Sequence, residues 1–502
     1  MTATTRRVYR GLGQAERTGW VLGLRPGQAM GVLALAVPVL VTLSAGQFRH
    51  AAVLAVLWIV VTCLIVVPVR GRPALRWLGH WLRYQFGVAT GWSRWQSRAA
   101  AGQPVDPHEP DLPGVLQRLA LPDGPPMRDR GRVCLIHDTV DARWGATARL
   151  THTGVGMLST EECARLASRL GNLLVSLGHR EAVDRLTLMV RTVPDDGSDH
   201  QVWRCQHESP TAPPLARQAT AELDRVLANS AVRHDVFVTV SGPEDKLRKP
   251  AAAAGGGVAG RGYVLYRVLE GLEEPLKALG APTVQWLGGS QLAEALRTGF
   301  APHDSGVLRT TRLTQPGTHG LPMAAAGPTQ TPSPSMTRYT HDAYSSVAYT
   351  VLMPDTIGFG ALSPLLAVRT AGERRSLAVH YEVLDAARAA RVVQSNRYRA
   401  NVLRDVKRGR GFASTAADER QAAGAHTAER AVAAGHAIVR YTVAAAVTVP
   451  SHWPVDDHAA RLENDAAGQF RLLRLDLAHD SGFVAACLPV GLGLPRQRGG
   501  ML

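Results

Sequence analysis

The feature that most constrains this chain is a pair of apolar runs near its amino terminus. Ala29–Ala45 and Ala51–Val69 contain no charged residue, and Arg49 is the one charge between them. A helix rises about 1.5 Å per residue, so the runs reach about 25 to 29 Å, close to the roughly 30 Å hydrocarbon core of a bilayer. The sequence therefore predicts two membrane-spanning helices, and we assign residues 28–69 to a membrane hairpin.

The flanks of the two runs predict their orientation. Gly46 to His50 leave room only for a tight reversal, so both flanks must face the same side of the membrane. Short arginine-rich flanks stay cytoplasmic, so we expect a multi-pass protein of the cell membrane with residues 1–27 as a basic leader and both termini in the cytoplasm. The flanking arginines are Arg6, Arg7, Arg10, Arg17 and Arg25 before the first run, and Arg70, Arg72, Arg76, Arg83, Arg94 and Arg98 after the second.

Two alternatives to this hairpin remain open. The first run could be a signal peptide, although its basic leader is long and a second apolar run follows at once. The pair could also be a buried hairpin of a soluble core, which better suits runs of 10 to 14 residues. Pro38 favours the membrane, because membrane helices tolerate proline where neighbouring groups satisfy the freed carbonyl.

Residues 70–100 form a basic aromatic segment beside the membrane. Trp77, Trp81 and Tyr84 recur at helical spacing and predict one aromatic stripe flanked by arginines. Rings and guanidinium groups are both accommodated in the lipid headgroup layer, where we expect this helix to lie. The alternative is a helix packed by its tryptophans onto the soluble domain. The candidate membrane-interface residues are Arg25, Arg70, Arg72, Arg76, Trp77, Trp81, Arg83, Tyr84, Trp92, Arg94, Trp95 and Arg98.

The net charge of +15 is concentrated near the amino terminus. Residues 1–100 hold 12 arginines and one acid, Glu16, which leaves 44 basic and 40 acidic residues for the rest of the chain. This distribution is explained by membrane topology and by attraction to anionic lipid headgroups. It argues against direct nucleic-acid binding by these arginines.

The remainder of the chain predicts an α+β fold in two domains. Alternating strand and helix patterns cover 101–300, a Pro/Thr-rich linker covers 301–335, and a second α+β stretch covers 336–502. The expected strands are 133–140, 142–151, 186–192, 234–241, 283–287, 346–352, 376–383, 437–449 and 470–475. The expected helices are 160–177, 214–230, 263–279, 291–298, 384–407 and 418–434.

The motifs of common enzymes are missing from the sequence. It contains no GxxxxGK[ST], no HExxH and no GxSxG, which removes the minimum parts of a P-loop ATPase, a zinc protease and a serine hydrolase. We therefore expect no enzyme, no catalytic residues, no cofactor and no metal. The five cysteines are widely spaced without a CxxC pair, and we interpret them as reduced thiols.

Three weaker patterns have structural explanations. The GxGxxG match at Gly255, Gly257 and Gly260 follows alanines instead of a strand, so a loop before a helix is the better interpretation. The two His-Asp pairs, at 137–138 and 341–342, lack further histidines at ligand spacing. The Asp-Asp-Gly at 195–197 is a turn signal.

Several short segments occur in a characteristic order along the chain. They are Gly71-Arg72, Trp92-Ser-Arg-Trp-Gln-Ser-Arg98, Asp111-Leu-Pro-Gly-Val-Leu116, Leu135-Ile-His-Asp138, Val190-Arg-Thr-Val-Pro-Asp-Asp-Gly197, Gly435-His436 and Leu488-Pro-Val-Gly-Leu-Gly-Leu494. Taken together with the apolar pair, these segments resemble a family of actinobacterial conjugation proteins. In that family a PrgI-like two-helix membrane module is fused to a region similar to the amino-terminal, non-nucleotide-binding part of conjugative type IV secretion ATPases. The sequence departs from the family pattern after Tyr349, where Leu352-Met-Pro354 replaces a tryptophan-proline strand end.

This resemblance implies a membrane scaffold of a DNA-transfer or secretion machine. The leading hypothesis is a non-enzymatic inner-membrane component of a conjugative, type IV secretion-like machine that associates with itself and docks a separate motor ATPase. Two alternatives stay open: an EccE-like component of type VII secretion, and a membrane-tethered DNA-binding module that uses the arginines at 70–98.

Overall fold

A computed structural model gives the protein two compact units. The anchor unit comprises Gly13–Arg94, and the sheet unit comprises Met1–Leu12 together with Trp95–Leu502. The structure describes residues 8–10, 26–69, 72–127, 131–152, 154–156, 158–194, 207–209, 211–230, 232–314, 320–332, 335–354, 356–385, 387–394 and 416–494.

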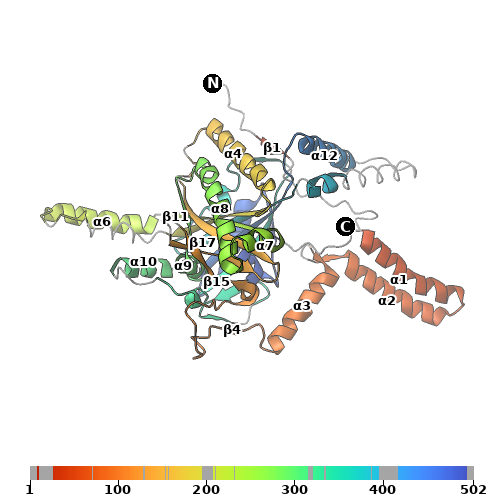
Figure 1. The fold of residues 1–502 in the computed structure, drawn as a ribbon. Coiled ribbons are helices and arrows are strands. Elements are labelled where there is room, and N and C mark those ends of the chain that lie inside the picture. The colour runs from red at the N-terminus through yellow and green to blue at the C-terminus, as the bar shows by residue number, and fades with distance from the viewer. Residues whose placement is uncertain are drawn as a thin grey trace, which may run out of the picture. The chain divides into compact units, whose positions relative to one another are not determined.

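The anchor unit contains three helices. Helices α1 (Pro26–Ser44) and α2 (Phe48–Val66) lie side by side and are joined by a short turn in which Gly46 adopts a φ of 71° (Figure 1). A two-strand ladder of β2 (Pro68–Val69) and β3 (Arg72–Pro73) leads to α3 (Ala74–Ala89). The predicted N-terminal helix pair is confirmed.

The sheet unit is built on one antiparallel sheet of eleven strands. Its order is β14-β15-β18-β17-β10-β11-β9-β8-β5, with β12 also paired to β9 and β19 to β15. The strands are β5 (Leu119–Ala120), β8 (Ile136–Asp138), β9 (Arg143–Thr151), β10 (Arg185–Pro194), β11 (Val232–Pro243), β12 (Thr283–Trp286), β14 (Tyr339–His341), β15 (Tyr344–Leu352), β17 (Arg374–Val383), β18 (Val439–Pro450) and β19 (Arg471–Arg474). The expected α+β class is confirmed.

The sheet joins the two stretches that the sequence divides. Strand β10 from the first stretch pairs with β17 from the second, from Arg185 opposite Glu382 to Thr192 opposite Arg375. The expected linker at 301–335 also contains α10 (Asp304–Thr314), η2 (Met323–Ala325) and β13 (Gln330–Thr331). The division into two domains is thus corrected to one sheet, because the backbone bonds of β10 and β17 cross the expected boundary.

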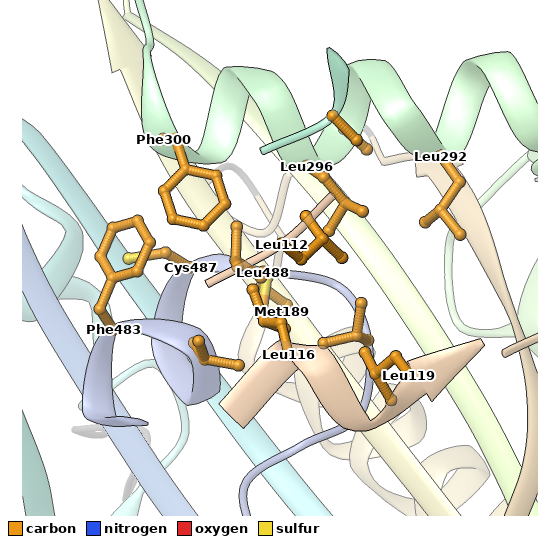
Figure 2. Packing of buried hydrophobic residues seen from close by; sticks show 14 of the residues in the cluster. Leu112, Leu116, Leu119, Met189, Leu292, Leu296, Phe300, Phe483, Cys487 and Leu488 are labelled. Carbon is orange, nitrogen blue, oxygen red and sulfur yellow. The ribbon is translucent and has the colours of Figure 1, made fainter. Parts of the chain in front are cut away.

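One face of the sheet is covered by α9 (Gly289–Phe300) and α14 (His479–Cys487). Met189 of β10 and Ala378 of β17 lie beneath these helices in one buried cluster. Figure 2 shows the rings of Phe300 of α9 and Phe483 of α14 next to each other at one side of this cluster, with centroids 5.3 Å apart. Small residues on the sheet leave room for the large side chains of the helices, so the layers pack closely.

The opposite face carries the remaining packed helices. Helices α4 (Thr160–Gly178), α7 (Glu244–Ala253) and α8 (Gly257–Ala278) contribute to one buried cluster, and α13 (Val455–Ala466) contributes to another. Helix α4 begins where Ser159 and Glu162 form a reciprocal capping box, which satisfies two amide donors at its first turn. The sheet is therefore the middle layer of three.

Buried arginines connect the sheet to α9. Arg191 Nη1 donates to Ala295 O at 2.8 Å, and Arg374 donates to Thr298 O at 2.8 Å and to Gly299 O at 2.5 Å. These carbonyls lie near the carboxyl end of α9, where the helix dipole favours a cation. Burial lowers the pKa of both guanidinium groups, and that of Arg191 falls to about 10, so Arg191 stays charged at neutral pH.

A second buried network surrounds the start of β17. Arg375 donates from Nε to Glu373 and from Nη1 to Asp465, both at 2.6 Å. His458 Nδ1 lies 2.7 Å from the other oxygen of Glu373. The side chains of Arg375 and Glu373 are fully buried, so each charge depends on the other for compensation.

Smaller elements complete the chain. The hairpin β6–β7 precedes β8, α6 lies between β10 and β11, and α12 lies between β17 and β18. Of the helix expected at 384–407, residues 387–394 are helical and 395–407 lie outside the described residues. The bounds are β6 (Asp123–Met127), β7 (Gly131–Cys134), α6 (Pro214–Ser230), α12 (Ala416–Ala433), η1 (Gly114–Arg118) and η3 (Ser363–Leu366).

Candidate membrane anchor

After Arg49 and His50 in its first turn, helix α2 is apolar around its whole circumference, and most of its side chains are exposed. Val53, Leu57 and Ile59 are 70%, 58% and 53% exposed, and Ala51 is its one buried residue. Its 19 residues make it long and apolar enough to cross a membrane. Contiguous apolar surface of this kind is unfavourable in water and favourable in lipid.

Helix α1 is apolar over a shorter described stretch. Gly31–Ser44 falls below the length of a full crossing, and Leu33 and Leu40 in it are 63% and 62% exposed. Pro38 interrupts the helix, and the hydroxyl of Thr42 donates to the Pro38 carbonyl at 3.0 Å. Among the described residues, one helix therefore passes the test for a crossing by its own length and composition.

A polar contact joins α1 to α2. The indole Nε1 of Trp58 donates to the carbonyl oxygen of Val32 at 3.0 Å. An indole N–H in hydrocarbon is costly unless it finds an acceptor, so this bond suits a helix pair in a low-dielectric environment. It also fixes the rotation of α2 against α1.

Helix α3 presents two different apolar faces. The predicted stripe of Trp77, Trp81 and Tyr84 is half-buried within the anchor unit. A second set, Leu75, Leu82 and Phe86, is 50%, 54% and 63% exposed. Sequence reasoning missed this second set, although its spacing of seven and four residues is the signature of one helix face.

The basic residues of the predicted segment lie in different places. Arg83 and Arg94 are exposed in the anchor unit, and Trp92 is 80% exposed. Arg25 and Arg70 lie outside the described residues; Arg72 and Arg76 have described backbone, in β3 and α3, without described side chains.

The last two predicted residues, Trp95 and Arg98, belong to the sheet unit. Trp95 opens the short strand β4 (Trp95–Gln96). Arg98 Nη1 bonds Glu109 at 2.8 Å, and this bond raises the arginine's pKa. Arg98 is therefore engaged with an acid of its own unit.

Two short strands of the sheet unit flank the anchor unit in the sequence. Strand β1 (Val8–Arg10) pairs antiparallel with β16 (Thr356–Gly358), and β4 pairs antiparallel with β13. The chain thus leaves the sheet unit after β1 and returns to it at β4. Sequence reasoning could not find this arrangement, because strands of two or three residues carry no periodic signal.

The weak enzymatic patterns do not come together. His137 is in β8 and stacks on Trp144 with ring centroids 4.1 Å apart, whereas His341 is in β14, at the other end of the strand order. Burial lowers the pKa of His341 to about 3, so it is neutral. Gly255 lies between α7 and α8, Gly257 begins α8 and Gly260 lies buried within α8, while the Asp-Asp-Gly at 195–197 lies outside the described residues.

An open cleft of about 470 Å³ lies beside His137 and Trp144, with Asp106, His108 and Glu109 among its lining residues. Among the described residues, no three His, Cys, Asp or Glu side chains have the arrangement of a metal centre. Cys134 and Cys487 are buried, and burial raises the pKa of both thiols. Buried thiols of this kind are poor nucleophiles.

Comparison with known proteins adds no further assignment. Neither a protein-family model nor a curated protein matches the chain.

Proposed function

We propose that this protein is a non-enzymatic scaffold of a conjugative DNA-transfer, type IV secretion-like machine. A two-helix hairpin holds it in the cell membrane, and the sheet unit docks a separate motor ATPase on the cytoplasmic side. The observation that carries this proposal is the placement of a membrane-length helix between two strands of the same folded unit. The identity of the machine comes from the sequence resemblance.

The flanking strands support a hairpin over a single crossing. A chain that leaves a folded unit through β1 and returns to it through β4 must cross the bilayer an even number of times. Because α2 has the length and composition for one crossing, we assign the return crossing to α1. The shorter apolar stretch of α1 is compatible with this role, since short helices are accommodated by local thinning of the bilayer.

Helix α3 supports a position at the membrane surface. Its exposed face of Leu75, Leu82 and Phe86 would enter the acyl boundary, and the exposed Arg83 would meet anionic headgroups. The aromatic stripe then stays within the anchor unit. This assignment combines the two interpretations that the sequence leaves open for the segment.

The topology is tested with a variant in which the five native cysteines are replaced. Gln47→Cys, in the turn between α1 and α2, should react with a membrane-impermeant maleimide in intact cells. Ser209→Cys, an exposed position of the sheet unit, should react only after permeabilisation. Labelling of Ser209→Cys in intact cells, or protection of Gln47→Cys until lysis, contradicts the hairpin.

The partner is tested by crosslinking in native membranes followed by mass spectrometry. Recovery of a conjugation-type ATPase supports the proposed machine, whereas an FtsK-type secretion ATPase assigns the protein to type VII secretion. Purified protein should not hydrolyse ATP; hydrolysis abolished by one side-chain substitution would overturn the scaffold proposal. Salt-sensitive DNA binding that is lost when the arginines at 70–98 are neutralised would replace it with a DNA-binding module.

A further inference from the structure

The two halves of the sheet unit share a series of elements in the same order, to which the first half adds β5, β6, β7, α4 and α7 and the second half adds β13, β16 and η3. Each half has a short strand, a long strand, a second long strand, a helical insertion, a third long strand, a helix, a four-residue strand and a final helix. In residues 112–302, which we name repeat one, these are β8, β9, β10, α6, β11, α8, β12 and α9. In residues 321–489, repeat two, they are β14, β15, β17, α12, β18, α13, β19 and α14.

The strand ladders of the two repeats agree residue by residue. In repeat one, Leu150 lies opposite Val236 and Arg143 opposite Pro243. In repeat two, Val351 lies opposite Val443 and Tyr344 opposite Pro450. The spacing along each strand is the same in both pairs, so one register describes both ladders.

The four-residue strands extend this agreement. Strand β12 pairs with β9 through Val284 opposite Leu150, and β19 pairs with β15 through Leu472 opposite Val351. Leu150 and Val351 are the equivalent residues of the preceding ladder. Each long strand therefore receives a third partner at the same point.

A two-fold axis relates the repeats. Ser241 of β11 and Thr448 of β18 are equivalent in the register described above. Arg185 lies opposite Ser241 and Arg374 lies opposite Thr448, so Arg185 and Arg374 are equivalent as well. By the same register Met189 is equivalent to Ala378, and these two residues lie opposite each other in the central ladder. The axis passes through this pair.

The residues beside the axis repeat this symmetry. Leu188 lies opposite Val379 on one side, and Leu377 lies opposite Val190 on the other. Exchange of the two repeats thus converts one leucine–valine pair into the other.

Strands β11 and β18 retain sequence identity at equivalent positions. Both have 12 residues and both end in proline. Identical residues occupy five equivalent positions: Val232 and Val439, Arg233 and Arg440, Val236 and Val443, Val240 and Val447, and Pro243 and Pro450. Spacing across the helical insertions hides this similarity from a search for short repeats.

The short helix that begins each repeat packs on the other repeat. Helix η1 follows Leu112-Pro113 and contacts α14, whereas η2 follows Leu321-Pro322 and contacts α9. Figure 2 shows Leu112 and Leu116 of repeat one close to Cys487 and Leu488 of repeat two. This reciprocal exchange is the arrangement that two chains of a swapped dimer adopt.

We propose that the sheet unit arose by duplication. Two copies of one α+β module are fused in one chain and associate as the two subunits of a dimer would. Repeat two is the copy adapted to pair with the strands that flank the anchor unit. Both strands that flank the anchor unit pair with repeat two, β1 on β16 and β4 on β13. At the place of β16, between the first two long strands, repeat one has α4 instead. The duplication is independent of the proposed machine.

A nicked protein tests the dimer-like assembly. A protease site is inserted at 315–319 of the full chain, between the repeats, and the purified protein is cut in detergent. The fragments should migrate as one complex and separate only in denaturant. Met189→Asp, at the axis, should release them, whereas Thr151→Asp, at the exposed end of β9, should not. Folded fragments that separate without denaturant would overturn the proposal.

An experimental structure of the unaltered protein tests the duplication without a variant. One rotation near 180° should superpose the repeats with Arg185 on Arg374, Leu150 on Val351 and Val284 on Leu472. A superposition that requires other pairs, or that fails for the four-residue strands, would overturn the duplication.

Discussion

Helix α2 and strand β17 have opposite relations between composition and burial. Helix α2 is among the most apolar segments of the chain, yet most of its side chains are exposed. Strand β17 carries Arg374, Arg375 and His380, and all three are buried. Burial within the protein therefore does not follow hydropathy in either segment.

The two segments need different surroundings to be stable. Exposed apolar surface on α2 is unfavourable in water and would be stable where lipid replaces water. The cations of β17 are stable because carbonyls at the end of α9 and the carboxylates of Glu373 and Asp465 surround them.

The largest effect is expected for Arg375→Met. Removal of this guanidinium leaves two carboxylates without their buried cation, and breaking such a network costs about 3–5 kcal/mol of unfolding free energy. Denaturant unfolding of the detergent-solubilised protein measures it. Arg369→Met is the matched control, because Arg369 pairs with the same Asp465 but is 66% exposed, and it should cost about 1 kcal/mol or less. Equal losses in the two variants would contradict the role of burial.

Leu57→Arg tests the environment of α2 and should reduce membrane insertion by about 2.5–3.5 kcal/mol, since Leu57 lies at the helix centre. Alkaline carbonate extraction should then release the variant but retain Leu57→Ile. The unfolding of the sheet unit should not change. A variant that stays fully membrane-bound would indicate that α2 does not span the bilayer.

Arg374→Met should destabilise the sheet unit by about 2 kcal/mol, because the carbonyls of Thr298 and Gly299 lose their donor and the dipole of α9 loses one of the two cations near its carboxyl end. Thermal or denaturant unfolding provides the measurement. Arg471→Met, at an exposed position of β19, should change stability by no more than about 0.5 kcal/mol. A similar loss in both variants would show that the carbonyl contacts contribute nothing specific.

The pH dependence of stability tests His380. Burial lowers its pKa to about 4, below the ordinary value of 6.5, while its Nε2 contacts the Ala485 carbonyl and its Nδ1 the Thr187 hydroxyl. Between these pH values the unfolded chain binds a proton that the native protein does not, so stability falls as pH decreases from 6.5 towards 4. The slope is about 1.4 kcal/mol per pH unit, and His380→Asn should remove that part of it. An unchanged slope would place His380 in a solvated site.

Segments with strong local patterns were predictable from the sequence. The apolar periodicity of α6 gives its bounds of 214–230 directly, and the apolar run that becomes α2 predicts a membrane-length helix. Strand β10 is recognisable from alternating residues. In each case the local pattern and the final environment agree.

Other features depend on contacts distant in sequence and escape local reasoning. Helix α14 contains glycine, serine and small residues with little periodicity, and it forms because it packs on the sheet. From the sequence alone, the arginines of β17 would be predicted to be exposed. Their acceptors lie in α9 and α13, which are distant in the sequence. The predictability of the candidate anchor is intermediate. Its helices are evident in the sequence, whereas the half-buried state of Trp77 and the exposed face that includes Leu75 are seen only from the packing of α3.

The carbonyl of Pro489 has a consequence for biosynthesis. It accepts hydrogen bonds from the buried hydroxyls of Thr147 and Thr239, at 2.7 and 3.2 Å, and Thr147 precedes it by 342 residues. During translation, those hydroxyls emerge from the ribosome long before their acceptor exists. The contacts of Pro489 with the two threonines can therefore form only after nearly the whole chain has been synthesised, so this part of the sheet unit is completed late.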